Sequence, residues 1–173
     1  MCASKAAEAA TESPSIAPLI DLLSSEMARV NTTILDRMDS KVPLVPQLAG
    51  HLIASGGKRM RPMMTIAGAV LGSGDESVRA PAVKLATAVE FIHSATLLHD
   101  DVIDESKLRR GQNTANALWG NDASVLVGDF LFARAFELMV EAGDMAVLGR
   151  LAAAAARITE GEILQMTITG QPD

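Results

Sequence analysis

Hydrophobic residues recur at helical spacing along most of this chain, and this pattern predicts an all-α fold. From residue 16 to about 38 the apolar positions follow the three- to four-residue period of an amphipathic helix. Pro43 and Pro46 interrupt the pattern, and a shorter helix is expected from about 46 to 54. The segment 55–57 should end it, because its glycines adopt the left-handed backbone of a helix end without strain.

The helical period continues to the end of the chain. Pro62 and Pro81 occupy positions typical of a first helical turn, so helices should begin near both prolines. The expected helices after residue 57 are 61–71, 81–105, 114–119, 123–141 and 145–169. A glycine-rich loop covers 72–75, and a basic loop covers 106–111. No alternating strand pattern competes with these helices, and no internal repeat is present.

Composition supports helices and argues against several classes of protein. Of the 173 residues, 49% are hydrophobic and only 3% are aromatic, with no tyrosine, which favours helices over strands. The net charge of −6 argues against a nucleic-acid partner, which would require a basic face. No apolar run reaches the roughly 20 residues of a transmembrane helix, so no membrane-spanning segment is expected.

The first 15 residues differ in composition from the rest. They are rich in Ala, Ser, Thr and Glu without a continuous apolar run, so we expect a disordered leader and not a signal peptide. Cys2 is the only cysteine, and no disulfide can therefore form within one chain. These features predict a cytoplasmic protein, and residues 16–173 are expected to belong to one domain.

Three aspartates follow the apolar part of the helix expected at 81–105. At about 100° per residue, Asp100, Asp104 and Asp101 lie at about 0°, 40° and 100° on the helical wheel, so their carboxylates crowd one face. Mg²⁺ would offset their mutual repulsion, because it binds carboxylate and phosphate oxygens. The alternative is a solvated acidic helix end. Acidic side chains are unfavourable at a helix C-terminus, and this favours the metal site.

Two basic elements accompany the aspartates. In the first, Arg109 and Arg110 lie beside Lys107, and arginine binds phosphate oxygens in a bidentate manner. The alternative is an exposed salt-bridge network with Asp104 or Glu105, which would contribute little to stability.

The second basic element is the segment 56–62, which combines two glycines with three cations at the start of a helix. Glycine lets backbone approach a ligand, and the amides of a helix N-terminus attract anions. Lys58 and Arg61 are therefore candidates for phosphate binding, although a basic surface loop is the alternative.

Two histidines precede the aspartates on the helix expected at 81–105. His93 lies on the same face of the helical wheel as Asp100 and is a candidate diphosphate contact. The alternative, which is more common for a lone histidine on an apolar helix, is a core residue whose hydrogen bonds are made inside the protein. His99 lies off that face and is expected to be structural.

Taken in order, these motifs resemble the trans-polyprenyl diphosphate synthases, and most closely the bacterial octaprenyl and decaprenyl diphosphate synthases. The resemblance extends from about residue 16 to the C-terminus and is carried by Gly57–Pro62, Glu90–Ser106, Leu108–Gly111, Val127–Leu131 and Gly161–Gln165. Terpene cyclases share the aspartate motif but lack the Gly-Lys-x-x-Arg element that this chain carries at 57–61. The resemblance implies an all-α helical bundle of the isoprenoid synthase type, incomplete in this chain.

The resemblance implies a prenyltransferase that joins isopentenyl diphosphate to an allylic diphosphate and makes a long polyprenyl chain, a precursor of quinone side chains. Mg²⁺ would bridge the allylic diphosphate to Asp100, Asp101 and Asp104. Arg109 would support that diphosphate. The residues implied to hold isopentenyl diphosphate are Lys58, Arg61, His93 and Arg110. The family is typically homodimeric, so a homo-oligomer is expected.

Product length in the family depends on residues just before the aspartate motif, which are Ala95 and Thr96 here. Both are small, as in long-chain enzymes, whereas short-chain enzymes place aromatic residues at these positions. Helical geometry puts Thr96 near Asp100 but Ala95 well off that face. Thr96 is therefore supported by geometry and by the resemblance, and Ala95 by the resemblance alone.

The chain also departs from the family pattern. It carries neither the second aspartate-rich motif nor the Lys-Thr pair of the family, and it stops at about half the family's length. We therefore expect a fragment that is inactive alone. One alternative is a non-catalytic partner subunit that regulates a prenyltransferase, but the intact aspartates, Lys58 and both arginines argue against it. A terpene cyclase fragment is disfavoured by the Lys58–Arg61 element.

Overall fold

The computed structural model describes residues 15–54, 57, 59–73 and 75–169. Lys58 and all but the last residue of the expected leader lie outside the described residues. In the described part, the helices are α1 (Ala17–Leu22), α2 (Ser24–Met38), α3 (Leu44–Ala54), α4 (Met60–Ser73), α5 (Arg79–Ile103), α6 (Ala115–Trp119), α7 (Asn121–Ala142) and α8 (Met145–Thr169). A 3₁₀ turn (Glu76–Val78) and two short strands, β1 (Leu108–Arg109) and β2 (Gln112–Asn113), complete the fold. The predicted all-α class is confirmed.

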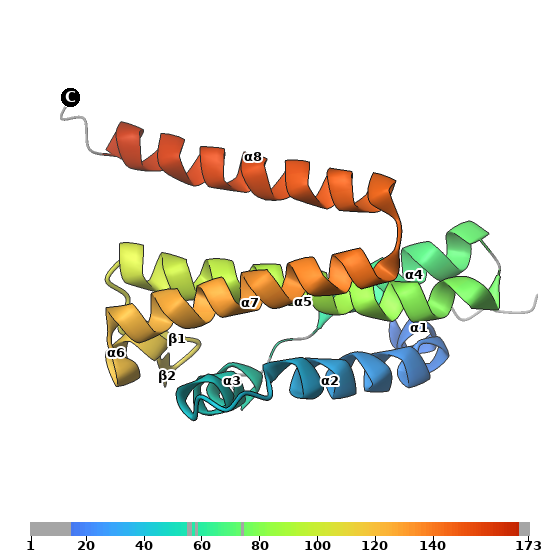
Figure 1. The fold of residues 1–173 in the computed structure, drawn as a ribbon, viewed down its shortest axis with the longest axis horizontal. Coiled ribbons are helices and arrows are strands. Elements are labelled where there is room, and N and C mark those ends of the chain that lie inside the picture. Colours follow the sequence, from blue (N-terminus) through green and yellow to red (C-terminus); the bar gives the residue numbers. More distant parts are fainter. Residues whose placement is uncertain (1–14, 55–56, 58, 74, 170–173) are drawn as a thin grey trace, which may run out of the picture.

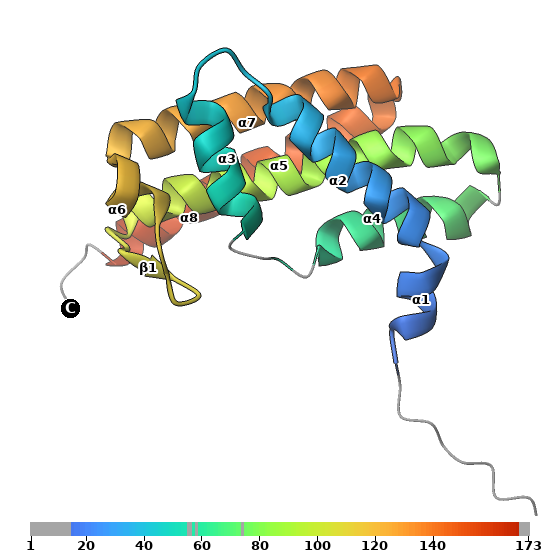
Figure 2. The same ribbon diagram turned by 90° about the horizontal axis from the view of Figure 1, so that it is seen from below.

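Helices α5 and α7 form the centre of the molecule and run side by side along most of their length (Figure 1). Helices α2 and α3 cover one face of this pair, and α8 lies over the opposite face (Figure 1). Figure 2 shows α4 beside the N-terminal part of α5, with α1 directed away from the bundle. The largest fully buried hydrophobic side chains of the core are Leu23, Val30, Leu48, Ile66, Phe91, Leu98, Leu131 and Leu138.

Small residues allow α5 and α7 to approach closely. Ala95 on α5 and Ala135 on α7 are fully buried. Gly128 of α7 lies against His99 of α5, and a Cβ at this glycine would be 2.2 Å from His99 Nε2. The predicted aspartates lie at the C-terminal end of α5, which packs against the N-terminal part of α7.

The structure differs from the periodicity at two places. The helix expected from 16 to 38 is divided into α1 and α2 at Leu23, which has φ −102° and ψ 9°. Two serines follow Leu23, and serine competes for backbone hydrogen bonds and so favours such breaks.

The second difference is a β-hairpin within the basic loop expected at 106–111. Arg109 pairs with Gln112, so the turn consists of Arg110 and Gly111, whose φ values are 53° and 80°. Positive φ at both positions is typical of a type I′ turn. Strands of two residues are too short to produce an alternating pattern in the sequence.

Helix α8 packs loosely on the rest of the protein. Asp144 caps its start, where Oδ1 accepts hydrogen bonds from the amides of Ala146 (2.9 Å) and Val147 (3.0 Å). None of its side chains for which burial is described is buried. Its exposed large apolar residues are Met145, Ile158, Ile163, Leu164, Met166 and Ile168. None of the described helices is both long enough and apolar enough to cross a bilayer.

Candidate active site

The three aspartates of the motif lie where α5 ends, and the structure separates them. Asp101 is 4% exposed, and its Oδ1 accepts hydrogen bonds from Arg109 Nε (3.0 Å) and Nη2 (2.8 Å). Asp100 lines a cavity beneath α8, and Asp104 lies in the turn that follows Ile103. Among the described residues, no three His, Cys, Asp or Glu side chains come together as a metal-binding group. Asp104 is close enough to Asp100 for its charge to raise the Asp100 pKa, whereas Asp101 is paired with Arg109.

Buried polar contacts fix the turn that carries Arg109. The carbonyl oxygen of Asp101 accepts hydrogen bonds from Ser106 N (2.9 Å) and Asn116 Nδ2 (3.0 Å). Thr114 Oγ1 donates to the carbonyl of Ser106 at 2.8 Å. These bonds tie the end of α5 to the start of α6, so the hairpin and its arginines are held against the aspartates.

The electrostatic surroundings of Asp100 are negative. Burial raises the pKa of the Asp100 carboxyl above its ordinary value of 3.8, and the charges of Glu162 and Asp104 raise it further. Glu162 lies on α8 and lines the same cavity as Asp100. Sequence reasoning assigned no role to Glu162, although it belongs to one of the segments that carry the resemblance. The surroundings of Asp100 favour a cation.

The basic residues predicted to hold isopentenyl diphosphate converge on one pocket. Arg61, His93 and Arg110 line a pocket of about 500 Å³ together with Gly57 and Arg59. Burial lowers the pKa of His93, and the charge of Arg61 lowers it further. Lys58 lies outside the described residues. Of the four predicted contacts, the structure therefore brings together the three that it describes.

An ion pair that the sequence did not predict also borders this pocket. Arg59 Nη1 lies 2.5 Å from Glu90 Oε1, and both side chains are largely shielded from solvent. The two residues are far apart in the sequence, and no spacing rule links a loop residue to a position on α5. Only the identity of Glu90 as an acid within a mostly apolar helix could have pointed to a partner.

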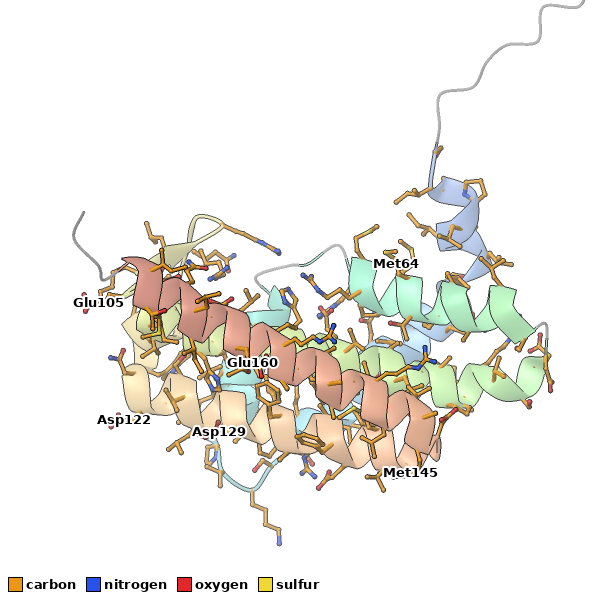
Figure 3. The ribbon with its side chains drawn as sticks, turned by 90° about the horizontal axis from the view of Figure 1, so that it is seen from above. Met64, Glu105, Asp122, Asp129, Met145 and Glu160 are labelled. Carbon is orange, nitrogen blue, oxygen red and sulfur yellow. The ribbon has the colours of Figure 1, made fainter. Side chains whose placement is uncertain are left out.

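A second, mostly apolar cavity of about 430 Å³ lies next to the basic pocket, beneath α8. Arg61 and His93 line both, so the pocket and the cavity are adjoining. The apolar side chains of the cavity include Val89, Ile92, Leu97, Ile103, Phe132 and Ile158. Figure 3 looks onto α8, which lies over the pair α5 and α7 and so over this cavity. Such a site fits a molecule with an anionic head and a hydrocarbon tail.

Of the two residues predicted to set product length, one lines the apolar cavity and the other does not. Thr96 lines the apolar cavity, and its Oγ1 donates a hydrogen bond to the carbonyl of His93 at 2.8 Å. Ala95 is fully buried and is not among the lining residues. His99, expected to be structural, also lines the cavity: its Nε2 lies 3.1 Å from the Val125 carbonyl, and its ring stacks on Phe132 with centroids 6.1 Å apart.

Comparison with known proteins gives consistent findings. The profile of the family described as polyprenyl synthetase matches residues 42–173. The octaprenyl diphosphate synthase of Escherichia coli is 46% identical over 153 residues, which are 88% of this chain and 46% of that protein. A nonaprenyl diphosphate synthase of Rhodobacter capsulatus is 45% identical over 151 residues, which are 87% of this chain and 46% of that protein. The chain spans about half the length of the curated relatives it matches.

Solved structures agree with the sequence comparison. A polyprenyl synthase from Caulobacter crescentus, complexed with calcium and isoprenyl diphosphate, has 57% identity and a TM-score of 0.83, over 90% of this chain and 46% of that one. A decaprenyl diphosphate synthase from Rhodobacter capsulatus has 54% identity and a TM-score of 0.80, over 87% of this chain and 46% of that one. The two comparisons therefore agree on the family and on the fold.

Proposed function

We propose that this chain, which belongs to the polyprenyl synthetase family, supplies the diphosphate-binding site of a prenyltransferase that makes a long polyprenyl chain. The observation that carries the proposal is that the basic pocket and the apolar cavity adjoin and share two lining residues. Arg61 and His93 border both, so a bound diphosphate would lie at the mouth of a hydrocarbon-sized space. The reaction joins isopentenyl diphosphate to an allylic diphosphate.

The donor set of Asp100 and Asp104 fits Mg²⁺. Two carboxylates are the usual protein contribution to a magnesium site that is completed by water and phosphate oxygens. When bound, the metal would neutralise the charge that develops on the departing diphosphate. The calcium in the Caulobacter relative supports a divalent ion in this family.

The other residues of the site would bind and orient the two substrates. Arg109, held by Asp101, would contact the allylic diphosphate as its carbon–oxygen bond breaks. Arg61, His93 and Arg110 would hold isopentenyl diphosphate so that its double bond attacks the allylic carbon, and a proton then passes to the released diphosphate. The apolar cavity would hold the growing chain away from water.

Further parts of the sequence-based prediction belong to this proposal. The quinone pathway and the cytoplasmic location remain predictions. A homo-oligomer is supported by exposed apolar residues on α7, namely Leu126, Phe136 and Val140. A non-catalytic partner subunit is not favoured, because such a subunit would have no need of this constellation of aspartates and arginines.

Binding of a non-hydrolysable allylic diphosphate analogue tests the proposal. Isothermal calorimetry should show binding that requires Mg²⁺ and that is lost in the variant Asp100→Asn. The control Asp36→Asn makes the same chemical change on the exposed face of α2 and should leave binding intact. Absence of binding by the wild-type chain, or binding indifferent to Mg²⁺, would contradict the proposal.

A turnover assay tests the separate expectation that this polypeptide is inactive alone. With Mg²⁺ and both diphosphates, we expect no sustained elongation above a protein-free blank. Steady product formation would show that the expectation of inactivity is wrong, while it would support the proposed chemistry.

A further inference from the structure

The basic pocket contains a buried acid whose presence needs an explanation. Among the described residues that line the pocket, Glu90 is the only carboxylate, and it stands with Arg59, Arg61, His93 and Arg110. Glu90 is 7% exposed. A carboxylate repels a phosphate group, so Glu90 by its charge alone weakens an anion site.

The backbone of Arg59 indicates what Glu90 does. Arg59 has φ 48°, a left-handed conformation that is strained for a residue other than glycine. Its carbonyl accepts a hydrogen bond from Met63 N at 3.1 Å, so Arg59 sets the first turn of α4. Arg61 lies in that first turn. The conformation of Arg59 therefore controls where Arg61 points.

A strained backbone persists only where its surroundings fix it. The ion pair with Glu90 supplies such a restraint, because Arg59 Nη1 and Glu90 Oε1 are 2.5 Å apart and both side chains are shielded from water. Glu90 also lies one helical turn before His93 on α5. One carboxylate thus joins the basic segment to the helix that carries the other half of the pocket.

We propose that Glu90 is a positioning residue for the diphosphate site: through Arg59 it holds the start of α4 so that Arg61 faces His93 and Arg110. The inference rests on the proposed function. If Glu90 positions the site, removing its negative charge should weaken diphosphate binding. If Glu90 acted only through its charge, the same change should strengthen diphosphate binding.

The test is the affinity for inorganic diphosphate, measured by calorimetry at pH 8, well above the ordinary pKa of histidine. Burial lowers the pKa of His93, and loss of the Glu90 charge would lower it further, so the variants do not differ by a proton on His93. Glu90→Ala should weaken binding about tenfold. Glu90→Gln retains an oxygen that accepts from Arg59 and should lose less. Glu90→Asp keeps the charge but is one methylene short of Arg59, so it should also weaken binding.

Glu76→Ala is the matched control, because Glu76 pairs with Arg79 at 2.7 Å on the exposed surface, away from the pocket. Amide exchange gives a second readout that needs no ligand. Exchange at the Met63 amide, which donates to the Arg59 carbonyl, should accelerate in Glu90→Ala and not in the control. If Glu90→Ala does not fold, the diphosphate affinity of Glu90→Asp can be compared with that of the wild-type chain instead, because this variant loses little side-chain volume.

The outcomes separate the two claims. A wild-type chain that fails to bind diphosphate overturns the proposed function and this inference with it. Wild-type binding that becomes equal or tighter in both Glu90→Ala and Glu90→Asp overturns the positioning role alone. Weaker binding in these two variants, with partial retention in Glu90→Gln, supports it.

Discussion

Asp100 and Asp101 are neighbours in the chain, yet their carboxylates have opposite surroundings. Asp101 is buried and paired with Arg109, whereas Asp100 faces the negative charges of Glu162 and Asp104. The difference follows from the 100° turn between consecutive helical residues. One carboxylate therefore orders an arginine, and the other is available to a cation.

This contrast predicts opposite effects on stability. Asp101→Asn weakens a buried charge-assisted pair and should lower the free energy of unfolding by about 1–3 kcal/mol. Asp100→Asn should stabilise the metal-free chain at pH 7, because the raised pKa of Asp100 means that its ionised form is disfavoured by folding.

The stabilisation predicted for Asp100→Asn should depend on pH. Well below pH 3.8, Asp100 is protonated in both the folded and the unfolded chain, so Asp100→Asn should have no advantage there. The advantage should grow as the pH rises above 3.8 and should be complete above the raised pKa of the folded state. Urea unfolding with EDTA at several pH values measures it, and a loss of stability in Asp100→Asn at pH 7 would contradict this reading.

From the sequence alone, only those site residues that lie on one helix could be placed together. His93, Thr96 and Asp100 share a face of α5, and helical spacing alone placed them together. Arg61 and Arg110 reach His93 from other elements, and only the resemblance linked them in advance. The Arg59–Glu90 pair and the approach of Glu162 depend on how α4 and α8 lie against α5, which no local pattern encodes.

At the scale of elements, the packing of α5 on α7 depends on one glycine. The absence of a side chain at Gly128 lets the His99 ring reach the Val125 carbonyl and stack on Phe132. An added methyl would overlap the ring and force it outward. The site is affected because His99 precedes Asp100.

Gly128→Ala should therefore destabilise the chain by about 1–3 kcal/mol, the usual cost of overpacking. Gly68→Ala is the control, since a Cβ at this position in α4 meets nothing within 4 Å. It should be stabilising by up to about 1 kcal/mol, because alanine favours a helix more than glycine does. Denaturant unfolding measures both, and equal effects would refute the proposed close contact.

Long helices could be predicted from the sequence, whereas features that involve only a few residues could not. The long helices were predicted because their apolar periods extend over many turns. The break at Leu23 and the hairpin at 108–113 were missed, because each involves only a few residues. Positive φ at Arg110 could not be anticipated either, since arginine has no preference for it.

At the scale of the whole molecule, the apolar cavity is lined by side chains from four helices, α4, α5, α7 and α8. Thr96 contributes from α5, Phe132 from α7 and Ile158 from α8. Ala95 faces the packed interior instead. The two residues predicted to set product length should therefore respond differently to the same substitution.

Thr96→Phe should fill the cavity, so that a longer allylic diphosphate analogue loses affinity relative to a shorter one, and the product of an active enzyme should be shorter. Ala95→Phe should instead lower stability by about 1–3 kcal/mol through overpacking. Calorimetry with two analogue lengths and thermal melts distinguish these effects. An unchanged length preference in Thr96→Phe would refute its assignment to the cavity wall.

The turn at Arg110 and Gly111 has a consequence for laboratory evolution of this protein. Asparagine and glycine adopt positive φ more readily than arginine, so a library selected for thermal resistance alone should accumulate Arg110→Asn or Arg110→Gly. A library selected for diphosphate capture should retain the cation despite its backbone cost. Sequencing both populations at this one codon would show whether folding or chemistry governs it.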